Sequence, residues 1–465
     1  MRLVENTKKI SKYEMDMTSG NFLRKLVVFC LPLILSGMLQ LFYNAADLAI
    51  VGSFSGKEGA VGAVGSTGAL IGLVTNLFIG LSVGANVLTA RYFAAKDSDK
   101  LSRVVHTAIT ISLLSGIFLA IIGVIFTPFF LKMMSNPNPL ATIYLRIYFI
   151  GMPFNLVYNF ASGILRGVGD TKRPLRYLTI AGILNVILNL IFVVVFKMDV
   201  DGVSLATIIS QAISCVLIIR CLMKSKEAYH FSIKLMRLYK EELKDIVKIG
   251  LPAGIQGVIF SISNVTIQST VNLFGTTIQD GNAAAQSLEG FVYVAMNSVY
   301  HASLAFVGQN MGAEKYHNIK KIMWYCLGIV CVIGIGLGGL VYVFNKVLIG
   351  FYTHNELSFD VAFLRLHYLC LPYFLYGIID VMVGVLRGMK KSLVPMIVSI
   401  LGICVFRVAW VLIVFNTFAN TTDISSLHWL YVSYPISWVI TFTAHFITFK
   451  IYHKKLMNNN LEIYA

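Results

Sequence analysis

A single carboxylate lies inside the first long apolar stretch of the sequence. Between Leu26 and Gly56, Asp47 is the only charged residue. Placing a carboxylate near the centre of a bilayer costs about 2.5–3.5 kcal/mol even on lenient insertion scales, and such acids tend to mark ion or substrate pathways. The alternative is that Asp47 caps a bend in a helix. We favour the first interpretation and take Asp47 as a candidate cation-binding or proton-binding group.

Three further polar residues are expected at the same membrane depth as Asp47. At 1.5 Å per residue, Asp47 lies roughly 15 Å from the outer end of its span, Asn189 roughly 12 Å and Thr207 roughly 9 Å. Asn185 precedes Asn189 by one helical turn and shares its face. A carboxylate, two amides and a hydroxyl are suitable oxygen ligands for Na⁺ and also a route for a proton. For the two asparagines taken alone, we favour a structural role as hydrogen-bonding groups between helices.

The elements that carry these residues are membrane spans. Of the 465 residues, 57% are hydrophobic and 13% are charged, and the mean hydropathy is +0.75, whereas a soluble protein carries about 25% charged residues. We therefore predict an all-α integral membrane protein. Twelve spans are expected, at 24–50, 60–84, 102–128, 140–163, 175–196, 202–222, 247–274, 283–307, 322–349, 361–385, 393–416 and 428–449.

The basic charge orients the protein in the membrane. The formal net charge is +16, but Lys and Arg gather on the side of the two termini. The other side is expected to hold Lys57, Lys132, Lys197 and Lys346, while Arg146, Arg365 and Arg407 lie in or beside spans. This asymmetry places both termini in the cytoplasm, so the basic charge requires no nucleic acid as partner. The seven cysteines all fall in apolar segments without metal-binding spacing, and no cofactor is expected.

The chain consists of two related halves. "LRIYFIGMPF" at 145–154 parallels "LRLHYLCLPYF" at 364–374, and "LRGVGDTKRP" at 165–174 parallels "LRGMKKSLVP" at 386–395. Six spans per half give both halves the same orientation, as in transporters built from parallel repeats. We expect two pseudo-symmetric six-helix bundles that can rock against each other. The expected organisation is a cytoplasmic N-terminus 1–23, an N-lobe 24–222, a cytoplasmic connector 223–246, a C-lobe 247–450 and a cytoplasmic tail 451–465.

The second half does not repeat the acid of the first. Its equivalent of Asp47 is Ile267. Glu289 and Arg407 are predicted to form an ion pair inside the C-lobe, in a structural role or as a substrate contact. Asp380 is placed near the cytoplasmic edge and receives little weight.

Aromatic and methionine side chains that face a cleft would suit flat organic cations. Candidates for the lining of a substrate cleft, beside Glu289, are Met38, Tyr43, Met152, Phe154 and Tyr158.

Pro32 is expected to bend the first span, since proline removes one helical hydrogen bond.

These features together resemble the multidrug and toxic compound extrusion (MATE) family, in its bacterial DinF-like branch. The resemblance covers nearly the whole chain and rests on an ordered set of motifs. They are "LPLILSGMLQLFYNAADLAIVG", "LRGVGDTKRP", "GILNVILNLIFVVVF" followed by "GVSLATIISQ", and "GLPAGIQGVIFSISNVTIQSTVNLFG" followed by "FVGQNMGAEKY".

The resemblance implies an antiporter that exports organic cations in exchange for H⁺ or Na⁺ by alternating access. It also implies a cation site in the N-lobe, at positions that here read Asp47, Asn185, Asn189 and Thr207, with Pro32 at the bend of the first span. The sequence departs from the branch at Asn189, where an aspartate is typical. Coupling would then rest on Asp47 alone, and an amide can still coordinate Na⁺.

Our expectation is a monomeric, multi-pass transporter in the cell membrane of a bacterium, with small organic cations and the lipid bilayer as partners. A flippase for lipid-linked saccharides, of the same superfold, is the alternative transporter, although it calls for a cationic cleft. An enzyme is not expected, because the spans contain no convincing Ser/His/Asp grouping and no metal-ligand pattern. A receptor is disfavoured by the lack of a sensing domain.

Overall fold

The protein is built from helices. The computed structural model describes residues 13–55, 60–133, 138–420 and 423–464, which contain helices and no strand. Within these ranges ten helices are long and apolar enough to cross a membrane, and the number rises to twelve if two bent pairs each count as one span. Residues 1–12 of the predicted N-terminal segment, the predicted outer Lys57 and the last residue, Ala465, lie outside the described ranges.

The first half contains six membrane-crossing units, in agreement with the predicted number. They are α1 (Phe22–Phe54), α2 (Ala60–Ala94), α3 (Ser98–Met133), the bent pair α4 (Pro139–Ile150) and α5 (Met152–Gly167), α6 (Lys172–Asn189) with the π-helix η1 (Leu190–Val195), and α7 (Val200–Lys224).

The second half repeats this order after a short connecting segment that includes η2 (Ile233–Leu235). It contains α8 (Lys240–Asn272), α9 (Thr276–Gly312), α10 (His317–Val343), the short α11 (Asn345–Gly350), and the bent pair α12 (Glu356–Leu369) and α13 (Phe374–Gly388). The eleventh span is a run of short elements: α14 (Leu393–Ser399), η3 (Ile400–Val405), α15 (Phe406–Trp410), η4 (Val411–Phe415) and α16 (Asn416–Phe418). The twelfth consists of η5 (Ile424–Ser426), α17 (Leu427–Tyr431) and α18 (Ser433–Tyr464).

The two bent pairs show the duplication at the level of structure. α4 and α5 meet at 49°, and so do α12 and α13. Each bend contains a proline at the equivalent position of the repeat, Pro153 in the first half and Pro372 in the second. Because proline lacks the N–H that an unbroken helix needs, the repeated proline accounts for the repeated bend.

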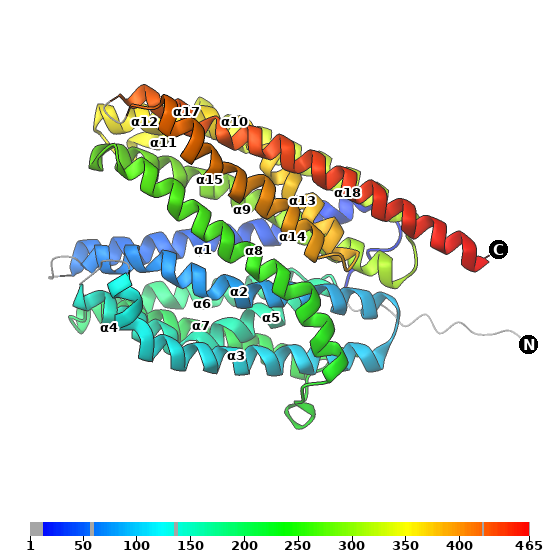
Figure 1. Ribbon diagram of the computed structural model, residues 1–465. Helices are drawn as coiled ribbons and strands as arrows, with labels where there is room; N and C mark the ends of the chain where they lie inside the picture. The colour runs from blue at the N-terminus through cyan, green and yellow to red at the C-terminus, as the bar shows by residue number, and fades with distance from the viewer. Residues whose placement is uncertain (1–12, 56–59, 134–137, 421–422, 465) are drawn as a thin grey trace, which may run out of the picture.

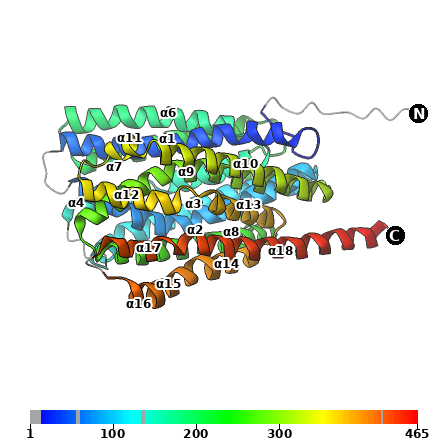
Figure 2. The ribbon, with the colours of Figure 1, turned by 90° about the horizontal axis from the view of Figure 1, so that it is seen from above.

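The two halves form two helical bundles, and both ends of the described chain lie at the same end of the molecule. In Figure 1, α2–α7 occupy the lower part and α9–α18 the upper part, with α1 running between them and α8 crossing obliquely beside α2. The start of α1 and the end of α18 lie at the same end of the molecule in both views (Figures 1 and 2). Both ends of the described chain therefore belong on one side of a membrane, while the assignment of that side to the cytoplasm rests on the charge pattern.

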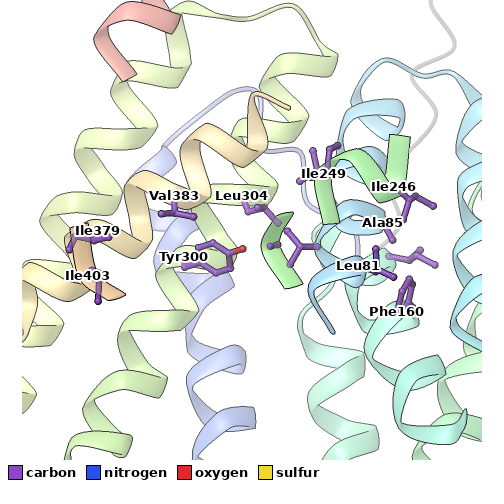
Figure 3. Close-up of a cluster of buried hydrophobic side chains, with 14 of the residues drawn as sticks. Leu81, Ala85, Phe160, Ile246, Ile249, Tyr300, Leu304, Ile379, Val383 and Ile403 are labelled. Atoms are coloured by element: carbon purple, nitrogen blue, oxygen red, sulfur yellow. The ribbon is translucent and has the colours of Figure 1, made fainter. Parts of the chain in front are cut away.

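Close packing of α2 against α8 holds the halves together. A Cβ added to Gly80 would lie 2.2 Å from the backbone nitrogen of Gly254, so only glycine permits this approach. A buried apolar cluster continues from there across the molecule. Figure 3 shows Leu81 and Phe160 of the first half on one side of this cluster and Val383 on the other.

The segment before α1 also bridges the halves. The backbone N–H of Met15 donates to the carbonyl of Val168, 3.1 Å away, and that of Met17 donates to the Gln309 side chain at 3.0 Å. Gln309 in turn donates to the carbonyl of Gly167 at 3.0 Å. We call residues 13–20 the N-terminal strap, since they join the end of α5 to the end of α9.

Several helices extend beyond the predicted boundaries. α8 begins at Lys240, inside the segment 223–246 that was expected to be a connector, and α18 continues to Tyr464 through most of the expected tail 451–465. Hydropathy marks only the lipid-facing part of a helix, whereas the helix itself continues into the polar region. The structure also splits the predicted spans 140–163 and 361–385 at their prolines.

Candidate functional site

The structure brings the four predicted polar residues of the first half into one cluster. The Asn189 amide donates to the Asp47 carboxylate, with 2.5 Å between nitrogen and oxygen, and also reaches the Asn185 carbonyl oxygen at 3.4 Å. The Asn185 amide reaches the Thr207 hydroxyl at 3.4 Å. Three spans, α1, α6 and α7, therefore contribute to a single polar cluster in an otherwise apolar bundle.

The cluster is almost closed to solvent and contains no described basic side chain. Asp47 is 8% exposed, Asn185 5% and Asn189 0%. Within the described part of the chain, the hydrogen-bonding groups around Asp47 are the Asn189 amide and the hydroxyl of Thr207. The side-chain oxygen of Asn189 is buried and has no described hydrogen-bond partner. A buried carboxylate with only neutral neighbours requires a proton or a bound cation, because an uncompensated charge in an apolar interior is costly.

The local helix geometry changes next to this cluster. α6 ends at Asn189, and the π-helix η1 begins at the following residue. Such widened turns are rare and occur frequently at functional sites. On the other wall, α1 runs as one continuous helix through Pro32. Its predicted role as a bend remains a prediction.

Two tyrosines near Asp47 were not predicted. Tyr144 and Tyr148 of α4 stack on each other with 6.1 Å between ring centroids, and both lie close enough to Asp47 to interact with its charge. They belong to, or pack against, the buried cluster that also contains Ile50 and Val51 of α1. Both tyrosines lie in the outer part of the predicted fourth span, so the sequence indicated that they could reach the depth of Asp47. Depth alone does not show which face of the helix points towards that residue.

The predicted pair of Glu289 and Arg407 is wrong. Glu289 accepts two hydrogen bonds from Arg365, at 2.7 and 2.8 Å, in a buried bidentate ion pair. Arg407 instead donates to Ser437 at 3.0 Å and lies over the Tyr434 ring, 3.9 Å from its centroid. Arg365 and Glu289 both sit near the outer ends of their spans, so helix depth favours this pairing over the one with the deeper Arg407.

Glu289 is consequently a poor candidate for contact with a substrate, because it is 6% exposed and its carboxylate is neutralised. Met152 was also predicted to line a cleft, and this is wrong. Its side chain is fully buried in the core of the first bundle. It lies directly at the α4–α5 bend, which turns it inward.

The other four cleft candidates are partly exposed. Tyr43 packs its ring against Gly182 of α6, and Tyr158 donates from its hydroxyl to the carbonyl of Pro174 at 3.0 Å. Both tyrosines therefore join helices within the first bundle. Met38 and Phe154 are half-buried.

Asp380, which was expected near the cytoplasmic edge, lies half-buried inside the second bundle. It lies on α13 beside Asn297, and its Oδ2 atom is buried with no described hydrogen-bond partner. Tyr293 and Tyr376 pack together nearby, with 5.8 Å between ring centroids. The second half therefore has an acid of its own within a span, with two tyrosines nearby.

Two bundles of helices long and apolar enough to cross a membrane, each with acids among its spans, define a multi-pass membrane protein. The model of the MatE family matches residues 32–191 and 252–413, one segment in each half. The chain therefore belongs to the MatE family, whose members are transporters and not enzymes.

Curated relatives agree with this assignment. The chain is 28% identical to the "Probable multidrug resistance protein YoeA" of Bacillus subtilis, over 82% of this chain and 84% of that protein. It is 23% identical to the "Multidrug export protein MepA" of Staphylococcus aureus, over 80% of this chain and 83% of that protein.

The same fold is found among solved structures. One described as "Outward-facing conformation of a multidrug resistance MATE family transporter of the MOP superfamily" superposes with a TM-score of 0.87 at 20% identity, covering 95% of this chain and 98% of that one. The predicted all-α fold of MATE type is thereby confirmed.

Proposed function

We propose that this protein is an antiporter that exports small organic cations in exchange for H⁺ or Na⁺, with Asp47 as the coupling group. The observation that carries the proposal is the buried carboxylate of Asp47, whose described hydrogen-bond partners are neutral. Relatives described as multidrug resistance and multidrug export proteins support an organic substrate.

The proposed cycle follows from the cost of an uncompensated buried charge. An entering H⁺ or Na⁺ neutralises Asp47 from the outer side. Neutralisation changes the packing of α1 against α6 and α7 and favours release of the cationic substrate to that side. The two halves then rock, the ion leaves to the cytoplasm, and a new substrate binds.

Asn189 restricts how the cycle can be coupled. Two neighbouring acids could pass a proton between them, but an amide beside Asp47 cannot take part as a second acid. Its buried side-chain oxygen is a suitable ligand for Na⁺. With Asn185 and Thr207, the cluster offers carboxylate, amide and hydroxyl oxygens to one small cation.

The substrate needs a counter-charge of its own, and we propose Asp380 for this role. Tyr293 and Tyr376 lie near this acid, and tyrosine rings favour organic cations through cation–π attraction. In this proposal, Asp47 binds the coupling ion and Asp380 binds the exported organic cation.

The test is uptake of a fluorescent organic cation into proteoliposomes, under a pure pH gradient and then a pure Na⁺ gradient. Asp47→Asn is expected to abolish gradient-driven transport while the protein still elutes as a single folded species. Asp380→Asn is expected to raise the substrate concentration for half-maximal transport while retaining dependence on the gradient. Asp360→Asn, which removes an exposed acid of α12, is the matched control and should transport normally.

Normal gradient-driven export by Asp47→Asn would refute the mechanism. The flippase alternative makes a different prediction for the same vesicles. It requires movement of a fluorescent lipid-linked saccharide across the bilayer without uptake of the organic cation under either gradient.

A further inference from the structure

An apolar groove lies between the first part of α1 and the first part of α10, outside the Asp47 cluster. Its volume is about 490 Å³, within the range of about 300–1,000 Å³ typical of small-molecule sites. Leu23, Val27 and Leu31 form one wall, and Trp324 and Val332 form the other. The groove therefore lies where the two halves of the protein meet.

The groove runs along the helices. Its lining residues recur at one-turn intervals on both helices, over roughly 15 Å of helix axis. Gly328 widens it, because a Cβ added at this position would meet no atom within 4 Å. An elongated, apolar and laterally open shape suits a hydrocarbon chain better than a compact polar ligand.

Basic side chains surround the end of the groove nearest the chain termini. Lys321 lies one turn before Tyr325 on the same face of α10, with its ammonium 5.8 Å from the ring centroid of Phe22 and 5.9 Å from that of Tyr325. Arg24 is exposed on α1 within a turn of Val27. Among the described residues, neither Lys321 nor Arg24 forms an ion pair, although nearby Lys25 pairs with Asp16.

A third cation comes from α18. Lys450 lies over the ring of Phe446, 4.7 Å from its centroid, and that ring packs edge-on against Trp324. Tryptophan at such a depth is typical of the boundary between acyl chains and headgroups. Three helices thus place positive charge at the headgroup level of one apolar groove.

We propose that this groove binds a phospholipid with an anionic headgroup, with one acyl chain between α1 and α10 and the phosphate beside Lys321 and Arg24. The charge complementarity selects an anionic lipid over a zwitterionic one. The lipid contacts α1 on both sides of Pro32, at Leu31 and Ile34. Its binding therefore stabilises the observed contact between the halves, and this inference does not depend on the proposed antiport.

The test uses quenching of Trp324 fluorescence by phospholipids with brominated acyl chains, in the purified full-length protein in mixed micelles. The difference between the wild type and Trp324→Phe isolates the signal of this residue. Brominated phosphatidylglycerol is expected to quench at lower lipid fractions than brominated phosphatidylcholine. Lys321→Gln should raise the fraction of phosphatidylglycerol needed for half-maximal quenching roughly fivefold. Each basic side chain near an anionic headgroup contributes about 1 kcal/mol of binding, which corresponds to that factor in affinity.

Two glycine variants of α10 test the groove itself. Gly328→Leu fills the open space and should reduce quenching by both lipids. Gly339→Leu is the matched control, because an added Cβ there also meets no atom within 4 Å and the position lies outside the groove. This variant should behave like the wild type.

Equal quenching by the two lipids in the wild type would overturn the choice of an anionic lipid. Unchanged quenching in Gly328→Leu would overturn the groove as the binding site. Protection of Trp324 that rises with protein concentration would instead assign the groove to a second copy of the chain. All three results measure lipid binding and not transport, so none of them bears on the proposed antiport.

Discussion

At the scale of single residues, the buried acids Glu289 and Asp47 differ in the groups that surround them. Glu289 is neutralised by a bidentate arginine, while Asp47 is surrounded by amides and a hydroxyl. The first arrangement satisfies a charge permanently, and the second leaves it responsive to a proton or a cation. The proposed coupling role of Asp47 rests on this contrast and not on burial, because Glu289 and Asp47 are 6% and 8% exposed.

The Glu289–Arg365 pair leads to a prediction about stability. Arg365→Leu leaves Glu289 buried without its cation, and breaking a buried pair in this way typically costs about 3–5 kcal/mol. The thermal midpoint of the detergent-solubilised protein should fall clearly. The double variant Glu289→Gln with Arg365→Leu should recover much of the loss, since no charge is then left unpaired. Equal destabilisation of the single and double variants would contradict this account.

At the scale of helices, the contact of α2 with α8 depends on glycine. Gly254 lies so close to α2 that an added Cβ would stand 2.2 Å from the carbonyl oxygen of Leu77. Backbone atoms cannot move aside as flexible side chains do. A side chain at position 254 would therefore force α8 and α2 apart.

Gly254→Ala should therefore destabilise the protein by roughly 1–3 kcal/mol, the usual cost of overpacking, and should also slow transport, because both halves meet at this crossing. Thermal melting and vesicle uptake measure the two effects. Gly290→Ala on α9, where an added Cβ meets no atom within 4 Å, is the control. A wild-type melting temperature in Gly254→Ala would show that the crossing has more room than the structure indicates.

The strap at residues 13–20 provides a prediction about pH. Burial tends to raise the pKa of Asp16, but hydrogen bonds from Ser19 and Thr18 and the charge of Lys25 outweigh it, so the pKa lies below its ordinary value. A group with a lowered pKa in the folded state stabilises that state above its unfolded pKa, which is about 3.9 for Asp. The stabilisation is lost as the pH falls through the folded value.

Amide hydrogen exchange of the strap should therefore be slow at neutral pH and accelerate below about pH 4, after correction for the intrinsic rate. Asp16→Asn should show the faster exchange already at neutral pH. A strap with the same protection in Asp16→Asn as in the wild type would show that its other contacts, those with Val168 and Gln309 among them, are sufficient to hold it.

At the scale of the whole molecule, the duplicated sequence produces a duplicated fold with unequal contents. Both halves have six membrane-crossing units and a 49° bend at a proline. The first half holds the Asp47 cluster, and the second holds the Glu289–Arg365 pair and Asp380. These different polar contents fit the proposed function, in which one half binds the coupling ion and the other contacts the substrate.

The sequence by itself determined the membrane class, the number of spans, the duplication and the depth of Asp47, Asn185, Asn189 and Thr207. These properties are local, since hydropathy and the rise of a helix need no knowledge of distant neighbours. Only the tertiary structure decided that Arg365 rather than Arg407 neutralises Glu289, that Met152 is buried, and that α1 and α10 leave a groove between them. Such contacts depend on how far each helix is rotated about its axis and which helix it packs against. Both are set by packing over the whole bundle.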